Sequence, residues 1–92
     1  MSRGGRTGTL SVMPSFLLHH THTADECAAT FAAWHGFASP LRSQAAASTC
    51  LAGGHALWWR VQATSANAAL ALLPPYVARR TNAIAVRDIQ IP

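Results

Sequence analysis

The chain has 92 residues, of which 50% are hydrophobic and only 11% charged, and its formal net charge is +4. This apolar composition excludes general disorder. The length suits one small domain with a modest hydrophobic core, and dimerisation would bury more apolar surface. No apolar run reaches the roughly 18–20 residues of a transmembrane helix, so we expect no membrane association.

The apolar run at residues 10–18 follows two arginines, as in a signal peptide, but Pro14 interrupts it and no cleavage pattern closes it. We therefore expect a cytoplasmic protein in which Cys27 and Cys50 are reduced thiols. The basic residues are all arginine, and they are scattered along the chain beyond residue 12. This scatter argues against a nucleic-acid partner, which requires basic residues gathered on one face.

Residues 1–12 are polar and rich in glycine, so they predict a flexible tail before a single domain over residues 13–92. The domain begins with a weak alternation of apolar and polar residues that predicts a first strand over 15–22.

A capping-box pattern follows the first strand. Thr23 and Glu26 have the spacing with which each can bond the other's backbone N–H, so a helix is expected over about 24–35. Gly36 suits the left-handed residue that ends such a helix. The helical spacing predicts a buried stripe made of Cys27, Phe31, Trp34 and Ala38.

Turn signals divide the second half of the chain. Gly53 and Gly54 can both take positive φ and predict a two-residue hairpin turn. Pro74 and Pro75 end a helix because each lacks an N–H, and Pro75 suits the start of a further short turn. The expected elements are a weak strand over 45–52, an aromatic strand over 55–63, an alanine-rich helix over 64–73 and a last strand over 81–91.

The resulting order, β-α-β-β-α-β, predicts an α+β fold of the ferredoxin-like kind. In such a fold two helices cover one face of a four-stranded antiparallel sheet, and the first and third strands are its central pair. The other face of the sheet is left open.

The hairpin decides which side chains share a face. With a two-residue turn, Cys50 lies opposite Leu57 beneath the helices, where it is expected to be a buried structural thiol. The open face then carries a convergent group made of His19, Trp58, Arg60 and Gln62. This group predicts either a ligand pocket, with Arg60 binding a carboxylate and His19 as acid or base, or a homodimer interface anchored by Trp58. We favour the interface.

The histidines of the first strand are candidate metal ligands. His20 and His22 point to one side of the strand and His19 to the other, so only the first two can share an ion. Cys27 and His55 could extend the set for zinc, copper or nickel. The favoured alternative needs no cofactor: hydrogen-bonded histidines at a sheet end, with Cys27 as a small core residue.

Four segments carry a resemblance to known proteins: HHTHTADEC, FASPLR, GGHALWW and LALLPPYVARRT. They are similar to segments of small actinobacterial proteins. From about residue 14 to residue 92, size and element order resemble the dimeric α/β-barrel superfamily, which includes muconolactone-isomerase-like and antibiotic-biosynthesis-monooxygenase-like proteins. The resemblance implies two sheets packed face to face and a pocket between sheet and helices. It matches no catalytic motif residue by residue.

Three functional hypotheses follow. The first is a small homodimer that binds a small apolar or anionic ligand, with cofactor-free isomerase or monooxygenase-type chemistry if it is an enzyme. The second is a transition-metal-binding protein that uses His20 and His22, and the third is a purely structural dimerisation module. The only acidic residues are Asp25, Glu26 and Asp88, which leave no carboxylate pair for hydrolysis.

Overall fold

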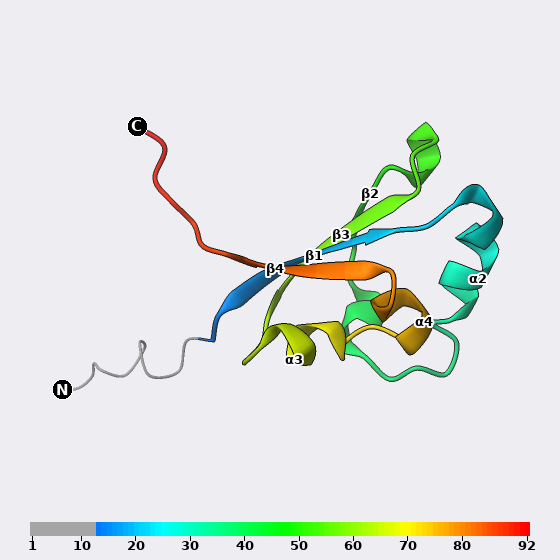
Figure 1. Cartoon of the computed structure of the whole chain (residues 1–92), viewed down its shortest axis with the longest axis horizontal. Helices are drawn as coiled ribbons and strands as arrows, with labels where there is room; N and C mark the ends of the chain where they lie inside the picture. Colours follow the sequence, from blue (N-terminus) through cyan, green and yellow to red (C-terminus); the bar gives the residue numbers. More distant parts are fainter. Residues whose placement is uncertain (1–12) are drawn as a thin grey trace.

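A four-stranded antiparallel sheet organises the computed structural model, which describes residues 13–92 (Figure 1). The tail predicted for residues 1–12 lies outside the described residues. The strands are arranged in the order β2-β3-β1-β4, so β1 and β3 are the central pair. Their bounds are Ser15–Thr21 for β1, Ala47–Ser48 for β2, Ala56–Gln62 for β3 and Thr81–Val86 for β4. The predicted α+β class is confirmed.

Short helices connect the strands, and the two helices predicted over 24–35 and 64–73 are shorter than expected. They are η1 at Ala24–Glu26, α2 at Cys27–Ala32, η2 at Pro40–Ser43, η3 at Cys50–Ala52, α3 at Ala66–Leu70 and α4 at Pro75–Ala78. Among residues 13–92, none of them has the length and apolarity that a bilayer crossing requires.

The helix ends follow the predicted chemistry. Thr23 N–H donates to Glu26 Oε1 at 2.9 Å, which confirms the capping box, and Gly36 takes a positive φ of 73°. Ser65 Oγ accepts from Ala68 N–H at 3.1 Å at the start of α3. Pro75 is in the first turn of α4.

One face of the sheet is covered. Leu18 and Trp59 are paired residues on this face and are 0% and 7% exposed. The helices contribute Ala69 and Val77 to the same core, both fully buried. Alternation along each strand therefore places the core, because successive side chains point to opposite faces.

The buried stripe predicted for the first helix is wrong. Thr30 is fully buried, whereas Phe31 is 48% exposed and Ala38 is also exposed. The more buried side of this segment carries Cys27, Thr30 and Trp34, of which the first and last are half-buried. Two members of the predicted stripe, Cys27 and Trp34, therefore lie on it, and Thr30 takes the place expected for Phe31.

The predicted hairpin register is also wrong. Ser48, not Cys50, lies opposite Leu57, because η3 occupies residues that were expected to extend the strand. The shift is two residues, and a shift by an even number leaves each side chain on its predicted face. Hence Trp58 and Arg60 still lie on the open face, but Cys50 lies in the turn and is half-buried.

Candidate functional site

The end of β1 divides its histidines between the two faces of the sheet. His19 pairs with Trp58 on the open face, and His20 pairs with Leu57 on the covered face. His22, just beyond the strand, lies on the same side as His20. His20 and His22, the two histidines on the covered side of the sheet, are 0% and 8% exposed, respectively.

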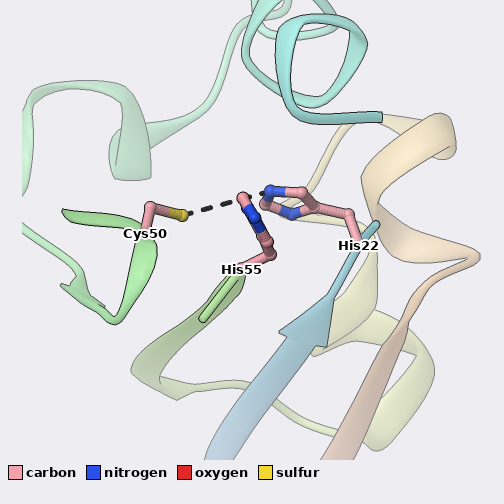
Figure 2. Close-up of side chains that lie close together, drawn as sticks. All are labelled: His22, Cys50 and His55. Carbon is pink, nitrogen blue, oxygen red and sulfur yellow. Dashed lines mark hydrogen bonds between the residues drawn. The ribbon is translucent and has the colours of Figure 1, made fainter. Parts of the chain in front are cut away.

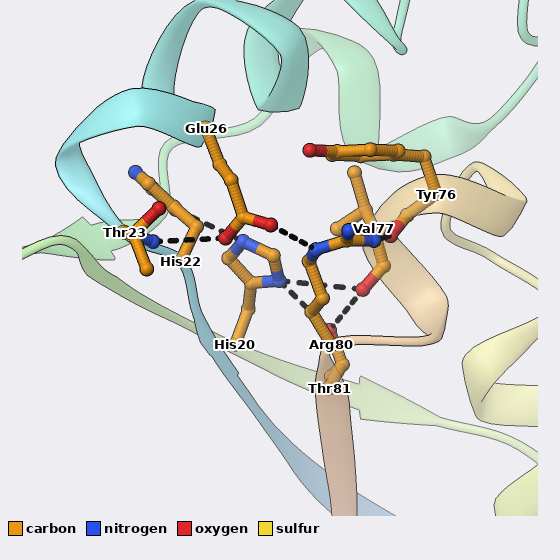
Figure 3. A network of polar contacts seen from close by, with 8 residues as sticks. All are labelled: His20, His22, Thr23, Glu26, Tyr76, Val77, Arg80 and Thr81. Carbon is orange, nitrogen blue, oxygen red and sulfur yellow. Dashed lines mark hydrogen bonds and ion pairs between the residues drawn. The ribbon is translucent and has the colours of Figure 1, made fainter.

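A short chain of hydrogen bonds fixes the tautomer of His20 (Figure 3). Its Nδ1 lies 3.3 Å from the Val77 carbonyl oxygen and 3.1 Å from Thr81 Oγ1, whose own hydroxyl donates to that carbonyl at 2.7 Å. Because the carbonyl only accepts and the hydroxyl hydrogen is already used, His20 Nδ1 must carry the hydrogen. In neutral His20 the other nitrogen, Nε2, is therefore an acceptor.

The same logic extends to the next histidine. His22 Nδ1 lies 3.0 Å from His20 Nε2 and so donates to it. Burial lowers the pKa of both His20 and His22. A lowered pKa favours the neutral form of each ring. His22 Nε2 is then an acceptor, and in the metal-free chain the Cys50 thiol donates to it with Sγ at 4.0 Å.

The side chains of His22, Cys50 and His55 form a cluster in which potential metal-ligand atoms lie close together (Figure 2). His22 Nε2 lies 4.0 Å from Cys50 Sγ, and one donor atom from each residue lies within 4.8 Å of those of the other two. His55 Nδ1 is buried and has no hydrogen-bond partner within residues 13–92. Imidazole nitrogen and thiolate sulfur together form a donor set suited to zinc or copper.

Backbone contacts bring the cluster together. His22 N–H donates to the His55 carbonyl at 3.0 Å, which holds the end of β1 beside the start of β3. His55 has a φ of 82°, an unusual conformation for a residue with a Cβ and one that marks functional sites. Cys50 N–H donates to Ser48 Oγ at 3.0 Å.

Thr49 closes the turn that carries Cys50 and His55. Its carbonyl accepts from Gly54 N–H at 2.8 Å, and its Oγ1 accepts from Ala56 N–H at 3.1 Å. A Cβ at Gly54 would clash with the Thr49 side chain. Glycine is therefore required here for close approach, whereas a positive φ occurs at Gly53.

The cluster differs from the predicted metal set of His20, His22, Cys27 and His55. His22 and His55 are in it, but His20 is used as the hydrogen-bond partner of His22, and Cys27 at the start of α2 is outside the group. Cys50 was missed because the two-residue turn placed it beneath the helices. The signal that could have revealed it is the close spacing of Cys50 and His55 around a glycine pair.

An ion pair lies beside the histidines. Arg80 Nε donates to Glu26 Oε2 at 3.0 Å, and the guanidinium carbon lies 3.8 Å from the centre of the Tyr76 ring (Figure 3). The Thr23 N–H and then Arg80 lower the pKa of Glu26. These contacts connect η1 to the start of β4, next to the buried histidines.

The residues predicted for the open face do share it. His19 stacks on Trp58 with ring centres 5.0 Å apart and planes within 5°. Arg60 and Gln62 project from the same side of β3, and Leu17 lies between Arg60 and Ile84 in the pairing. Arg60 donates to Asp88 at 3.0 Å, so its guanidinium already has one carboxylate partner on this exposed face.

No protein-family model, no curated protein and no solved structure matches the chain.

Proposed function

We propose that this protein binds a transition-metal ion through His22, Cys50 and His55. The observation that carries the proposal is the convergence of three donor atoms within 4.8 Å, one of them a histidine nitrogen that the hydrogen bonds behind it leave unprotonated and directed at Cys50. The unpartnered, buried Nδ1 of His55 supports it, since buried polar atoms normally have a partner.

The donor set selects the metal. One thiolate and two imidazoles favour Zn²⁺ or a copper ion over the hard cations Mg²⁺ and Ca²⁺, which prefer oxygen ligands. In a tetrahedral zinc site the sulfur and nitrogen ligands are roughly 3.6 Å apart. The separation between His22 Nε2 and Cys50 Sγ is 4.0 Å, so this pair requires only a small contraction.

The hydrogen bonds behind His22 support the same proposal. Ligating histidines usually donate their second ring N–H to an acceptor, which fixes the ring orientation. His22 donates to His20, and His20 in turn bonds the Val77 carbonyl. Three protein ligands leave a position open for water or for an added ligand.

The test is metal titration of the chain prepared without a histidine tag and stripped with a chelator. We expect one Zn²⁺ per chain by calorimetry and, with Co²⁺ as a probe, an intense thiolate-to-cobalt absorption band. His22→Ala and His55→Ala should each weaken binding at least about a hundredfold, while His19→Ala on the open face should not.

The cysteines supply a matched control. Cys50→Ser should abolish the cobalt band, and Cys27→Ser should leave it intact, because Cys27 lies outside the cluster. Absence of Zn²⁺ binding would overturn the proposal, and so would a band that depends on Cys27 in place of Cys50.

The open face favours a second candidate function, a homodimeric α/β barrel of the ferredoxin-like kind. The strand order and the covered face are compatible with that fold. The open face presents Leu17 beside Ile84, which is 46% exposed, and the stacked His19 and Trp58. A second copy packed on this surface would remove these apolar groups from water.

Light scattering at micromolar concentration tests this second candidate. A dimer that dissociates in Trp58→Glu, with Gln44→Glu as a control away from the open face, is the expected result. A wild-type monomer would contradict it. The isomerase or monooxygenase-type chemistry that the resemblance implies stays a prediction.

A further inference from the structure

A cavity of about 450 Å³ opens between the covered face of the sheet and the segment from α2 to η2. Its volume lies in the range of small-molecule sites. It lies on the covered side of the sheet, where the resemblance implied a pocket, and not on the open face with His19 and Trp58; none of the three cluster residues lines it.

Aromatic and aliphatic side chains form most of the cavity wall. Leu57 and Trp59 of β3 contribute from the sheet, and Phe31, Trp34 and Leu41 contribute from the other side. The rings of Trp34 and Trp59 are tilted against each other with centres 5.9 Å apart. Such a wall favours a flat apolar group, which can contact ring faces and edges.

The charged residue on the wall is Arg42, an exposed residue of η2. Among the described residues the ion pairs are Glu26 with Arg80 and Asp88 with Arg60, so Arg42 has no acidic partner there. A guanidinium binds a carboxylate through two parallel hydrogen bonds. Gln44, on the same wall, adds an amide group.

The position of Arg42 is set by its neighbours in η2. Ser39 Oγ donates to the Leu72 carbonyl at 2.7 Å and accepts from Leu41 N–H at 3.2 Å. Leu41 is 6% exposed, so it is fixed in the core. These contacts fix the backbone of η2 beside the cavity, and an anionic group bound to Arg42 would have its apolar part among the aromatic residues.

We propose that this cavity binds a small aromatic carboxylic acid, with the ring among Trp34, Trp59 and Phe31 and the carboxylate on Arg42. The site is independent of the metal cluster and requires no bound ion. It gives a location and a chemical class to the small anionic ligand that the sequence suggested.

The test uses 3-phenylpropionate as the probe and 3-phenylpropanol as its uncharged counterpart, both in the presence of a chelator. The chain has three tryptophans, so three indole N–H signals can be followed by nuclear magnetic resonance. We expect the acid to bind with a dissociation constant below about 1 mM and to shift the signals of Trp34 and Trp59. Trp58, on the open face, should shift least.

Two variants separate the parts of the site. Arg42→Gln should weaken binding of the acid at least about tenfold and leave the alcohol unchanged, whereas Arg79→Gln, an exposed control, should change neither. Ala46→Leu adds bulk to the cavity wall and should weaken both probes. Dispersed spectra of each variant verify that it is folded.

The proposal is overturned if the acid does not bind at millimolar concentration, or if acid and alcohol bind equally well. It is also overturned if Trp58 shows the largest shift, because the ligand would then lie on the open face. Since a chelator is present throughout, failure here leaves the metal proposal standing, and loss of metal binding leaves this one standing.

Discussion

His19 and His20 are adjacent in the sequence, yet the sheet separates their environments completely. His19 lies on the open face, stacked on Trp58. His20 is fully buried and bonded at both ring nitrogens, to Val77, Thr81 and His22. The difference shows that the alternation of a strand can turn one histidine-rich segment into a surface contact and a buried polar network.

The largest expected difference is in the free energy of unfolding when the imidazole ring of His20 or of His19 is removed. His20→Ala leaves a cavity and unpaired buried groups, so it should lower the free energy of unfolding by about 2–4 kcal/mol. His19→Ala loses one stacked contact and should cost no more than about 1 kcal/mol. Urea unfolding of the metal-free chain measures both. Equal losses would contradict the assignment of the two faces.

Low pH should destabilise the fold through His20 and His22, the histidines on the covered side of the sheet. Burial holds the pKa of His20 and of His22 below the ordinary value of 6.5, so below about pH 6.5 the unfolded chain binds more protons than the folded one. Their contribution is therefore fully present above about pH 6.5 and is lost as the pH falls, by up to about 1.4 kcal/mol per unit for each ring.

Urea midpoints between about pH 8 and pH 5, in chelator, test the pH dependence. His19→Ala retains both covered rings and should keep the same acid-side slope. A stability that stays flat over this range would show that the covered rings are not held neutral.

Two threonine hydroxyls on the covered side allow a comparison between a buried polar group with a hydrogen-bond partner and one without. Thr30 Oγ1 is buried without a partner, whereas Thr81 donates to Val77 at 2.7 Å. Thr30→Val should stabilise the fold by about 0.5–1 kcal/mol, and Thr81→Val should destabilise it by about 1 kcal/mol. Thermal unfolding measured side by side distinguishes the two signs, and the same sign in both variants would refute this account.

The smallest effect is expected on the open face. Arg60 and Asp88 form an ion pair whose side chains are 50% and 90% exposed. Solvent screens such a pair, so Asp88→Asn should change stability by less than about 0.5 kcal/mol. Unfolding at low and high salt provides the measurement. A larger, salt-sensitive loss would mean that this contact is protected from water, as in a dimer interface.

Much of the fold could be predicted locally. The capping box at Thr23 and the short turn at Pro75 were confirmed because each depends on residues only a few positions apart. The facing of Trp58 and Trp59 was confirmed because alternation needs no knowledge of the partner strand. Helix lengths were overpredicted, since packing decides where such short helices end.

The metal cluster could be predicted only in part. Alternation put His20 and His22 on one side of β1, but it could not reveal that the first would bond the second instead of sharing an ion with it. Cys50 was misplaced because the glycine pair predicts a tight hairpin, and the 3-10 turn η3 formed in its place. Side-chain tautomers and turn geometry depend on neighbours that are remote in the sequence.

The sequence by itself determined the α+β class, the faces of the residues on the two central strands and the chemistry of the helix ends, because these depend on periodicity and on contacts between near neighbours. Only the tertiary structure decided that His22 meets Cys50 and His55, and that Arg42 lies beside a cavity lined by aromatic rings. Those groupings join segments far apart in the chain, and the packing of the sheet against its short helices sets the distances between them.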